Sequence, residues 1–322
     1  MPALLAVLVC GAVTPLFALI AARVGLVDRP DRGALKIHQD PRPLSGGAAI
    51  VFTVLVVVAG AGAGPGVWVV AAILVLLAVG MADDAWNLRP EVRLAAQCGS
   101  GVLLMLGGLR IEPLGSLGPA AVVVAVPLLA NGVNLTDGQD GLASGLGLMA
   151  AFGLWLIGES FDVDGVVAVS LIGALLGFLV WNRPPAAVFL GDGGAYALGG
   201  LLAILTAASS ATWSSFLGSA VCLSIFAVEL VSTVIRRATR SASLVRGDRE
   251  HLYDLLARHA RGRTKATLIM CGVGALVSAA GVLVANAPLP AAATIAAAVL
   301  AVEIALAQAL RKEPGAMLRR SR

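Results

Sequence analysis

Long apolar runs separated by short polar segments make up this chain from its first residues to its last. A run of about twenty apolar residues can cross a lipid bilayer, and shorter runs suffice where flanking side chains reach the interface. On this rule the pattern predicts eleven transmembrane helices, at residues 3–22, 46–62, 67–82, 94–109, 117–131, 141–158, 164–181, 194–208, 213–235, 266–285 and 289–309. The runs at 117–131 and 194–208 are short, so nine or ten spans are alternatives. We expect an all-α polytopic integral membrane protein with about 10–11 transmembrane helices.

Composition supports this interpretation. Only 13% of the residues are charged, whereas soluble proteins carry about 25%, and the mean hydropathy is +0.91. We therefore predict a single membrane domain over residues 1–322, ending in a basic cytoplasmic tail at 310–322. The first apolar run is interpreted as a retained span and not a cleaved signal, because its first charge, Arg23, follows the run. The four cysteines lie inside apolar runs without paired spacing and predict neither disulfides nor a metal site.

The basic residues predict the orientation. If the N-terminus lies outside, 22 of the 23 lysines and arginines fall in inner loops or the C-terminal tail, and only Arg110 lies outside. The outer loops instead hold Glu112, Glu159, Asp162 and Asp164. Cytoplasmic loops are enriched in lysine and arginine, so we predict an outer N-terminus and a cytoplasmic C-terminus. The basic pI is then a consequence of topology, and nucleic acid is not an expected partner.

The inner loops also collect the polar side chains that can carry chemistry. Residues 131–141, which we call the central polar segment, place Asn131, Asn134, Asp137 and Asp140 between two apolar runs. Unpaired carboxylates near lipid are costly, so we expect a cation or a polar ligand there. Other inner loops add further acids, glycines and bases, namely Arg32, Lys36, Asp83, Asp84, Gly191, Asp192, Gly193, Gly194 and His251. Carboxylates combined with substrate phosphates are the preferred surroundings of Mg²⁺, so this set predicts phosphate chemistry.

Each motif has an ordinary interpretation when it stands alone. The pair Asp83-Asp84 resembles solvated acids at a helix end, and Gly191-Asp192 resembles a turn. The central polar segment lacks the spacing and terminal glutamate of a calcium-binding EF-hand loop. His251 alone would be taken for a surface histidine. Phosphate chemistry is favoured because the five loops that carry these side chains all lie on the same predicted side of the membrane.

At this point the motifs resemble a family, the polyprenyl-phosphate N-acetylhexosamine-1-phosphate transferases, relatives of phospho-MurNAc-pentapeptide translocase. The resemblance runs from about residue 25 to 260. It rests on Asp28-x-Pro-x-Arg32, His38-x-x-Pro-x-Pro-x-x-Gly-Gly, Asp83-Asp84, Asn131-x-x-Asn134-x-x-Asp137-Gly-x-Asp140-Gly-Leu-Ala and Phe189-x-Gly-Asp192-x-Gly.

The resemblance implies a reaction at the cytoplasmic face of a bacterial membrane. An oxygen of undecaprenyl phosphate attacks the sugar-linked phosphate of a UDP-sugar, most simply UDP-GlcNAc. The products are a lipid-diphosphate-sugar and UMP, at the first membrane step of a cell-envelope glycan such as lipopolysaccharide or teichoic acid. The expected cofactor is Mg²⁺, with Mn²⁺ as an alternative. The bilayer is a further partner, and a homodimer is compatible with these expectations.

The resemblance also implies roles for residues. Asp192 and Asn134 are expected to hold the metal, and Asp83 and Asp84 to bind or deprotonate the lipid phosphate, which makes Asp83, Asp84 and Asp192 the expected catalytic residues. The expected substrate-binding residues are Lys36, His38, Asn131, Asn134, Asp137, Asp140, Phe189, Gly191 and His251. Phe189 is expected to stack on uracil and His251 to hold the diphosphate.

Three positions depart from the family pattern. The histidine-rich motif keeps only His251, Ala195 replaces a usual serine, and Glu229 stands where many relatives carry aspartate. The first departure argues against the MurNAc-pentapeptide branch, so another UDP-N-acetylhexosamine is an alternative donor. From another class, a transporter of nucleotide-sugars or lipid-linked sugars is the main alternative, although transporters place polar groups near the midplane. A third alternative is a non-catalytic scaffold. Glu303 receives no role.

Overall fold

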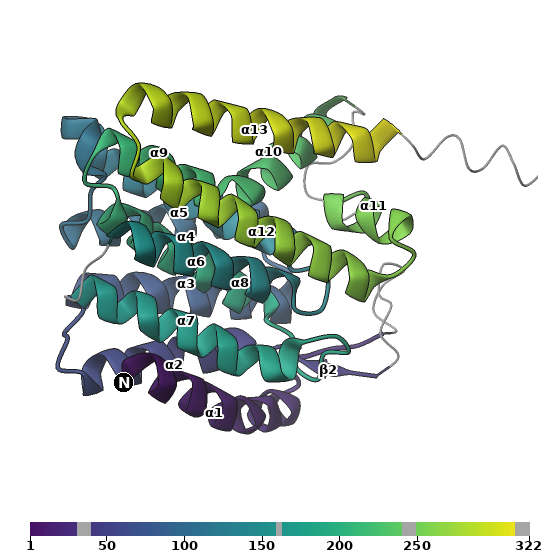
Figure 1. The fold of residues 1–322 in the computed structure, drawn as a ribbon. Helices are drawn as coiled ribbons and strands as arrows, with labels where there is room; N and C mark the ends of the chain where they lie inside the picture. The colour runs from purple at the N-terminus through teal and green to yellow at the C-terminus, as the bar shows by residue number, and fades with distance from the viewer. Residues whose placement is uncertain (31–39, 159–162, 240–248, 313–322) are drawn as a thin grey trace, which may run out of the picture.

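The structure, a computed structural model, describes residues 1–30, 40–158, 163–239 and 249–312, and most of them are helical. Figure 1 shows the long helices lying side by side, with α1 and α2 along one edge of the bundle and α13 along the opposite edge. The helices are α1 (Pro2–Val24), α2 (Gly46–Gly60), α3 (Val67–Trp86), α4 (Pro90–Leu106), η1 (Glu112–Leu117), α5 (Gly118–Thr136), α6 (Leu142–Gly158), α7 (Val163–Asn182), α8 (Gly191–Ser209), α9 (Trp213–Cys222), α10 (Ser224–Thr239), α11 (Leu252–His259), α12 (Arg263–Ala285) and α13 (Leu289–Lys312). Two short antiparallel strands, β1 (Val27–Asp28) and β2 (Arg42–Pro43), complete the described part of the chain.

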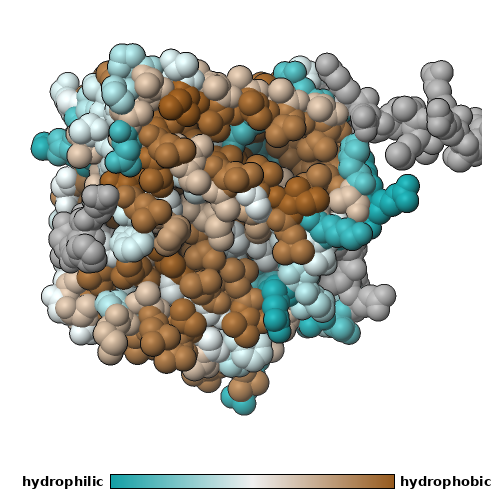
Figure 2. Space-filling model, in the orientation of Figure 1, coloured by the Kyte–Doolittle hydropathy of each residue, from teal (hydrophilic) through white to brown (hydrophobic). Residues whose placement is uncertain are grey.

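The predicted all-α polytopic membrane fold is confirmed. A helix occupies each of the eleven predicted ranges. Within the described residues six helices are long and apolar enough to cross a membrane alone, and α9 with α10 makes a bent seventh. Figure 2 shows a broad apolar surface across the lateral face, with hydrophilic residues gathered toward its ends. Soluble proteins rarely expose so large an apolar surface, so this face suits contact with lipid.

Two features differ from the sequence prediction. The expected span at 213–235 is broken at Leu223 into α9 and α10, which meet at a bend of 63°. The hydroxyl of Ser224 donates to the carbonyl of Val221 at 2.7 Å, and such side-chain bonds compete with the helical ladder and bend helices. The short helix α11 lies in a segment predicted as loop.

Helix α8 lies at the centre of the bundle and is buried along nearly its whole length. It packs against α2, α3, α5 and α6. Small residues permit this close approach: a β-carbon added to Gly80 of α3 would stand 2.4 Å from the backbone of Asp192 and Gly193. The first turn of α8 is thereby fixed against the last two turns of α3.

The candidate site lies at one end of this bundle. In Figure 1 the strand β2, helix α11 and the C-terminal end of α13 lie at the same end, opposite the start of α1. The ends of α3 and α5 and the start of α8 reach the same region, because residues of all three line shared cavities there.

Candidate active site

The polar residues predicted in inner loops lie mostly on helices. Asp83 and Asp84 belong to the last turn of α3, Asn131 and Asn134 to α5, and Asp192 to the first turn of α8. The predicted spans of α3 and α5 therefore end too early, and that of α8 begins too late. The helices continue because each of these side chains finds a polar partner within the bundle, so burial does not leave it unsatisfied.

Asp192 and the central polar segment form one acidic centre. The amide of Asn134 donates to Oδ1 of Asp192 at 2.5 Å. Asp137 follows directly after α5 and lines the same two cavities as Asp192. Burial, together with the negative charges of Asp192 and Asp84, raises the pKa of Asp137 well above its usual range. A site that concentrates negative charge in this way favours a bound cation.

Asp84 supports the first turn of α8. Its carboxylate accepts hydrogen bonds from the backbone N–H groups of Asp192 at 3.1 Å and of Gly193 at 3.3 Å. The first N–H groups of a helix have no partner within it, so Asp84 serves as a cap supplied by another helix. Gly191 has φ +76°, and a β-carbon there would stand 2.8 Å from the Asp84 carboxylate. The turn therefore requires glycine.

Asp83 is buried and already has three hydrogen-bond donors. Its Oδ1 accepts from the backbone N–H of Leu88 at 2.8 Å. Its Oδ2 accepts from the Arg93 guanidinium at 2.8 Å and from the Tyr196 hydroxyl at 2.9 Å. Asp83 thus joins α3, α4 and α8 and orients the guanidinium of Arg93.

Asp140 and Phe189 belong to two non-helical segments that line the site. Oδ2 of Asp140 accepts from the backbone N–H of Ala186 at 2.9 Å. Phe189 donates its backbone N–H to the carbonyl of Pro43 and forms a parallel bridge with Leu44. The segment before α8 is therefore held between the segment that precedes α6 and the β1–β2 strand pair.

Two adjoining cavities open among these residues. The first, which we call the acidic cavity, has a volume of about 1030 Å³. Its lining contains seven aspartates and, among the described residues, a single basic side chain, Arg42. The aspartates are Asp28, Asp40, Asp83, Asp84, Asp137, Asp140 and Asp192, and Asn182, Phe189 and Gly191 also line it. The predicted substrate-binding residues Asp137, Asp140, Phe189 and Gly191 therefore share one cavity.

The second cavity, which we call the arginine cavity, has a volume of about 360 Å³. Arg93, Arg237 and His251 line it together with Asn131 and Asn134. Its apolar wall is formed by Leu135, Leu230 and Val234. Asp137, Gly138 and Asp192 line both cavities and form the boundary between them.

Some functional candidates escape the sequence prediction. Arg93 and Arg237 line the arginine cavity. In the sequence they serve only as basic residues that indicate the membrane orientation. Gln97 lies four residues after Arg93, on the same helix face, and accepts from the amide of Asn131 at 2.7 Å, but this contact is not visible in the sequence. Tyr253 also lines the cavity, and its ring lies directly over Gly138. Arg32, Lys36 and His38 lie outside the described residues, so their predicted roles remain predictions.

The donor set fits a metal that also uses substrate oxygens. Within the described residues, no group of three or more histidine, cysteine, aspartate or glutamate side chains is arranged to enclose a metal by itself. Mg²⁺ is usually bound by one or two carboxylates together with water and substrate phosphates. Asp192 and Asp137 lie at the boundary of the two cavities, and Asn134 lines the arginine cavity beside them. These residues satisfy that requirement.

Comparisons with known proteins show what this chain is similar to. Residues 67–210 match the family described as glycosyl transferase family 4. A probable undecaprenyl-phosphate N-acetylglucosaminyl 1-phosphate transferase of Bacillus subtilis is 26% identical over 85% of this chain and 82% of its own length. A decaprenyl-phosphate N-acetylglucosaminephosphotransferase of Mycobacterium leprae is 26% identical over 80% of this chain and 76% of its own length. A phospho-N-acetylmuramoyl-pentapeptide-transferase of Enterococcus faecalis is 41% identical over 35% of this chain and 36% of its own length. The resemblance found in the sequence motifs is confirmed.

Proposed function

We propose that this chain, whose residues 67–210 match glycosyl transferase family 4, transfers GlcNAc-1-phosphate from UDP-GlcNAc to undecaprenyl phosphate. An oxygen of the lipid phosphate forms a bond to the phosphorus that carries the sugar. The bond from that phosphorus to the bridging oxygen breaks, and UMP leaves with the bridging oxygen and its electron pair. The main support for this proposal is that Asp137 and Asp192 lie at the boundary between two cavities. One of these cavities is lined by aspartates, and the other also contains arginines.

The acidic cavity is the proposed site of the UDP-sugar. Its larger volume of about 1030 Å³ suits a nucleotide and a sugar together. Phe189 offers a ring for uracil, and Asp137 and Asp140 offer acceptors for the nucleoside hydroxyl and imide groups. A diphosphate cannot enter so acidic a cavity unless cations compensate its charge. Mg²⁺, or Mn²⁺ in its place, is the proposed cofactor.

Asp192 and Asn134, with Asp137, are the residues that would hold this metal. The bound metal would neutralise the negative charge that develops on the departing UMP. Asp84 contributes by fixing the backbone of Asp192 through the first turn of α8.

The arginine cavity is the proposed site of the lipid phosphate. Arg93 and Arg237 provide positive charge, and an apolar wall suits the first isoprene units. Val234 lines this cavity and is also exposed on the outside of α10, beside exposed Val231 and Ile235. An apolar chain can therefore leave the cavity along α10 into lipid.

The hydrogen bond from Arg93 to Asp83 indicates a role for Asp83 in this arrangement. A phosphate monoester has its second pKa near 6, so at neutral pH it needs little help to lose its proton. The carboxylate of Asp83 already accepts three hydrogen bonds, one of them from Arg93. We therefore assign Asp83 to orientation of Arg93 rather than to proton abstraction.

The proposed location of the site is the cytoplasmic side of a bacterial membrane. The segregation of lysine and arginine supports it. A UDP-sugar donor is consistent with the same side, since Arg42, Arg93 and Arg237, all in or beside predicted inner loops, line the two cavities.

One experiment separates transfer from its alternatives. The purified protein is incubated with undecaprenyl phosphate, Mg²⁺ and a panel of UDP-N-acetylhexosamines, and UMP and lipid-diphosphate-sugar are measured. Equal amounts of both products, lost on addition of EDTA, are expected with UDP-GlcNAc. Product from another UDP-sugar alone would correct the donor. Transport of a UDP-sugar or lipid-linked sugar across sealed vesicles without UMP release would contradict the proposal.

A further inference from the structure

A buried glutamate of α10, Glu229, lies beneath the arginine cavity. Its side chain is 1% exposed, and both of its carboxylate oxygens accept hydrogen bonds. Oε1 accepts from the hydroxyl of Thr233 at 3.2 Å, and Oε2 accepts from the backbone N–H of Leu252 at 3.1 Å. Burying a carboxylate is costly unless donors surround it, so this arrangement indicates a specific role.

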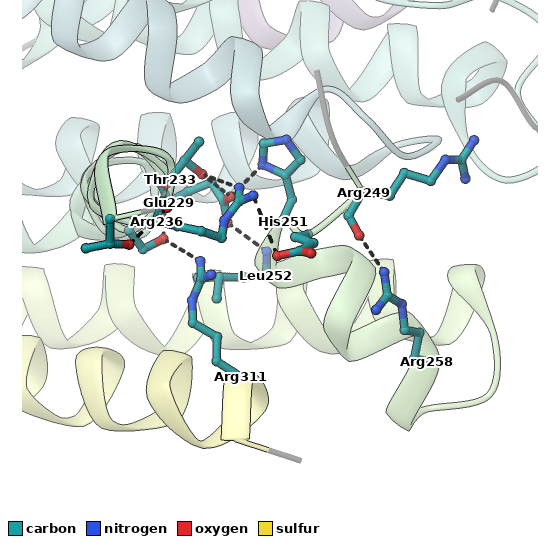
Figure 3. Close-up of polar contacts among 11 residues, drawn as sticks. Glu229, Thr233, Arg236, Arg249, His251, Leu252, Arg258 and Arg311 are labelled. Carbon is teal, nitrogen blue, oxygen red and sulfur yellow. Dashed lines mark hydrogen bonds and ion pairs between the residues drawn. The ribbon is translucent and has the colours of Figure 1, made fainter. Parts of the chain in front are cut away.

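His251 provides a further partner. Its Nδ1 lies 2.8 Å from Oε1 of Glu229, and Figure 3 shows the ring above the carboxylate with this contact between them. Because both oxygens of Glu229 act as acceptors, Nδ1 must be the donor. The hydrogen on Nδ1 is therefore fixed whether the ring is neutral or charged. A histidine whose one nitrogen is held by a carboxylate presents the other nitrogen, Nε2, in a defined direction.

The surroundings of His251 restrict its ring further. Its plane lies parallel to that of Tyr253, at 5.3 Å between centroids and 5° between planes. Tyr253 in turn packs over Gly138, at the boundary of the two cavities. His251 is also the N-cap of α11, and the Leu252 N–H held by Glu229 belongs to the first residue of that helix. One carboxylate thus fixes both the ring and the helix start.

We propose that Glu229 is a positioning residue that sets the tautomer and direction of His251, so that Nε2 of His251 meets a substrate phosphate. This inference rests on the proposed function, which supplies that phosphate. Glu229 itself touches no substrate in this arrangement. Its position also links His251 to Arg237, which lies two turns later on α10 and lines the same cavity.

A double-mutant cycle tests the coupling between the two residues. In Glu229→Gln one acceptor oxygen becomes an NH₂ group, which opposes either the Leu252 N–H or Nδ1 of His251. We expect Glu229→Gln and His251→Gln each to lower kcat by roughly 10- to 100-fold, the range for partners that orient a functional histidine. The double variant should lose no more than the worse single variant, because Glu229 acts through His251. Losses that multiply in the double variant, or a Glu229→Gln enzyme within about twofold of wild type, would overturn the proposal.

Glu250→Gln is the matched control. Glu250 directly precedes His251, and its side chain, 38% exposed, lies 3.9 Å from the guanidinium of Arg236, which is 6% exposed. Glutamine keeps a side-chain oxygen that can accept from this guanidinium, so near wild-type turnover is expected. Thermal unfolding of all variants shows whether a loss of activity reflects loss of fold.

A spectroscopic measurement tests the pairing in the wild-type protein without turnover. The chain has three histidines, so ¹⁵N-histidine labelling gives three ring signals, and comparison with His251→Gln identifies the signals of His251. We expect the pattern of a ring that carries its hydrogen on Nδ1. A ring with hydrogen only on Nε2 would contradict the assignment. If the wild-type protein forms no lipid product, the proposed function fails, whereas the pairing of Glu229 with His251 is still tested by this spectrum.

Discussion

The carboxylate of Asp84, at the end of α3, accepts a hydrogen bond from the backbone N–H of Asp192, at the start of α8, at 3.1 Å. Two aspartates that are 108 residues apart in the sequence are therefore linked by the main chain of one and the side chain of the other. The bond leaves the side chain of Asp192 available to Asn134 and the two cavities. We therefore propose that Asp84 sets where the proposed metal ligand lies.

Replacing Asp84 tests this supporting role. Asp84→Ala removes the cap of α8, which costs about 0.5–2 kcal/mol in comparable helices. We expect a lower unfolding temperature and a weaker apparent affinity for Mg²⁺ in the transfer assay. Saturating Mg²⁺ should recover part of the activity. An unchanged Mg²⁺ requirement combined with a large fall in kcat would instead assign Asp84 to the chemical step.

The close contact of α3 with α8 predicts the effect of a single methyl group. A β-carbon at Gly80 would stand 2.4 Å from the backbone of α8, so Gly80→Ala must push the two helices apart. Overpacking of this kind costs about 1–3 kcal/mol, and it would displace Asp192 from Asp84. We expect loss of thermal stability and of transfer activity together.

Gly99→Ala is the matched control for that change. Gly99 also lies within a helix, α4, but a β-carbon there meets nothing within 4 Å. Alanine is favoured over glycine in a helix by about 0.5–1 kcal/mol, so stability should hold or rise. Equal behaviour of the two variants would show that α3 and α8 do not need this contact.

Arg93 provides a test of the lipid-phosphate site. Arg93→Met removes the guanidinium that Asp83 orients while keeping much of the apolar side chain. We expect KM for undecaprenyl phosphate to rise by at least about tenfold, since a charge-assisted bond to phosphate contributes about 1.5–3 kcal/mol. KM for UDP-GlcNAc should change much less. Steady-state kinetics with each substrate varied in turn measure both values.

Arg89→Met serves as the control for Arg93. Arg89 is exposed and stands at the N-terminal boundary of the same helix, α4, four residues earlier. It is not among the residues that line either cavity. Equal increases in KM for the lipid in both variants would indicate a general charge effect at the membrane surface and would remove Arg93 from the site.

The sequence predicted the bundle well because hydrophobic length is a strong and local signal. The predicted range 141–158 differs from α6 (Leu142–Gly158) by one residue at one end. Ends that carry polar residues were predicted less well. Asn131 and Asn134 extend α5 as far as Thr136, because their amides are satisfied by Gln97 and Asp192. Both partners are distant in the sequence, so no local pattern reveals them.

Some residues of the candidate site could likewise be predicted from the sequence, and others could not. The acids of the central polar segment and Asp192 could be chosen from residue type and spacing, and the structure brings them to one boundary. Arg93 could not be chosen, because in sequence it is one of many basic residues on its side of the membrane. The partnership of Glu229 with His251 also depends on tertiary structure, since the two residues are 22 apart in the sequence and lie on separate elements.

Membrane orientation is open to a labelling experiment. Leu117 and Trp86 are both highly exposed and lie toward opposite ends of the bundle, at η1 and at the end of α3. In a variant without the four native cysteines, Leu117→Cys should react with an impermeant maleimide added outside intact cells. Trp86→Cys should react only after permeabilisation. The reverse result would place the site on the outer face.

The central claim is that Asp192 helps to hold a metal on the diphosphate of the donor. Its most direct test is electron paramagnetic resonance of Mn²⁺ bound to the protein in the presence of UDP-GlcNAc, with ³¹P coupling recorded for wild type and for Asp192→Asn. We predict one protein-bound Mn²⁺ coupled to phosphorus in wild type. In Asp192→Asn its affinity should be at least about tenfold weaker, because the ligand charge is lost. An Asp192→Asn protein with the same affinity and the same phosphorus coupling would contradict the account.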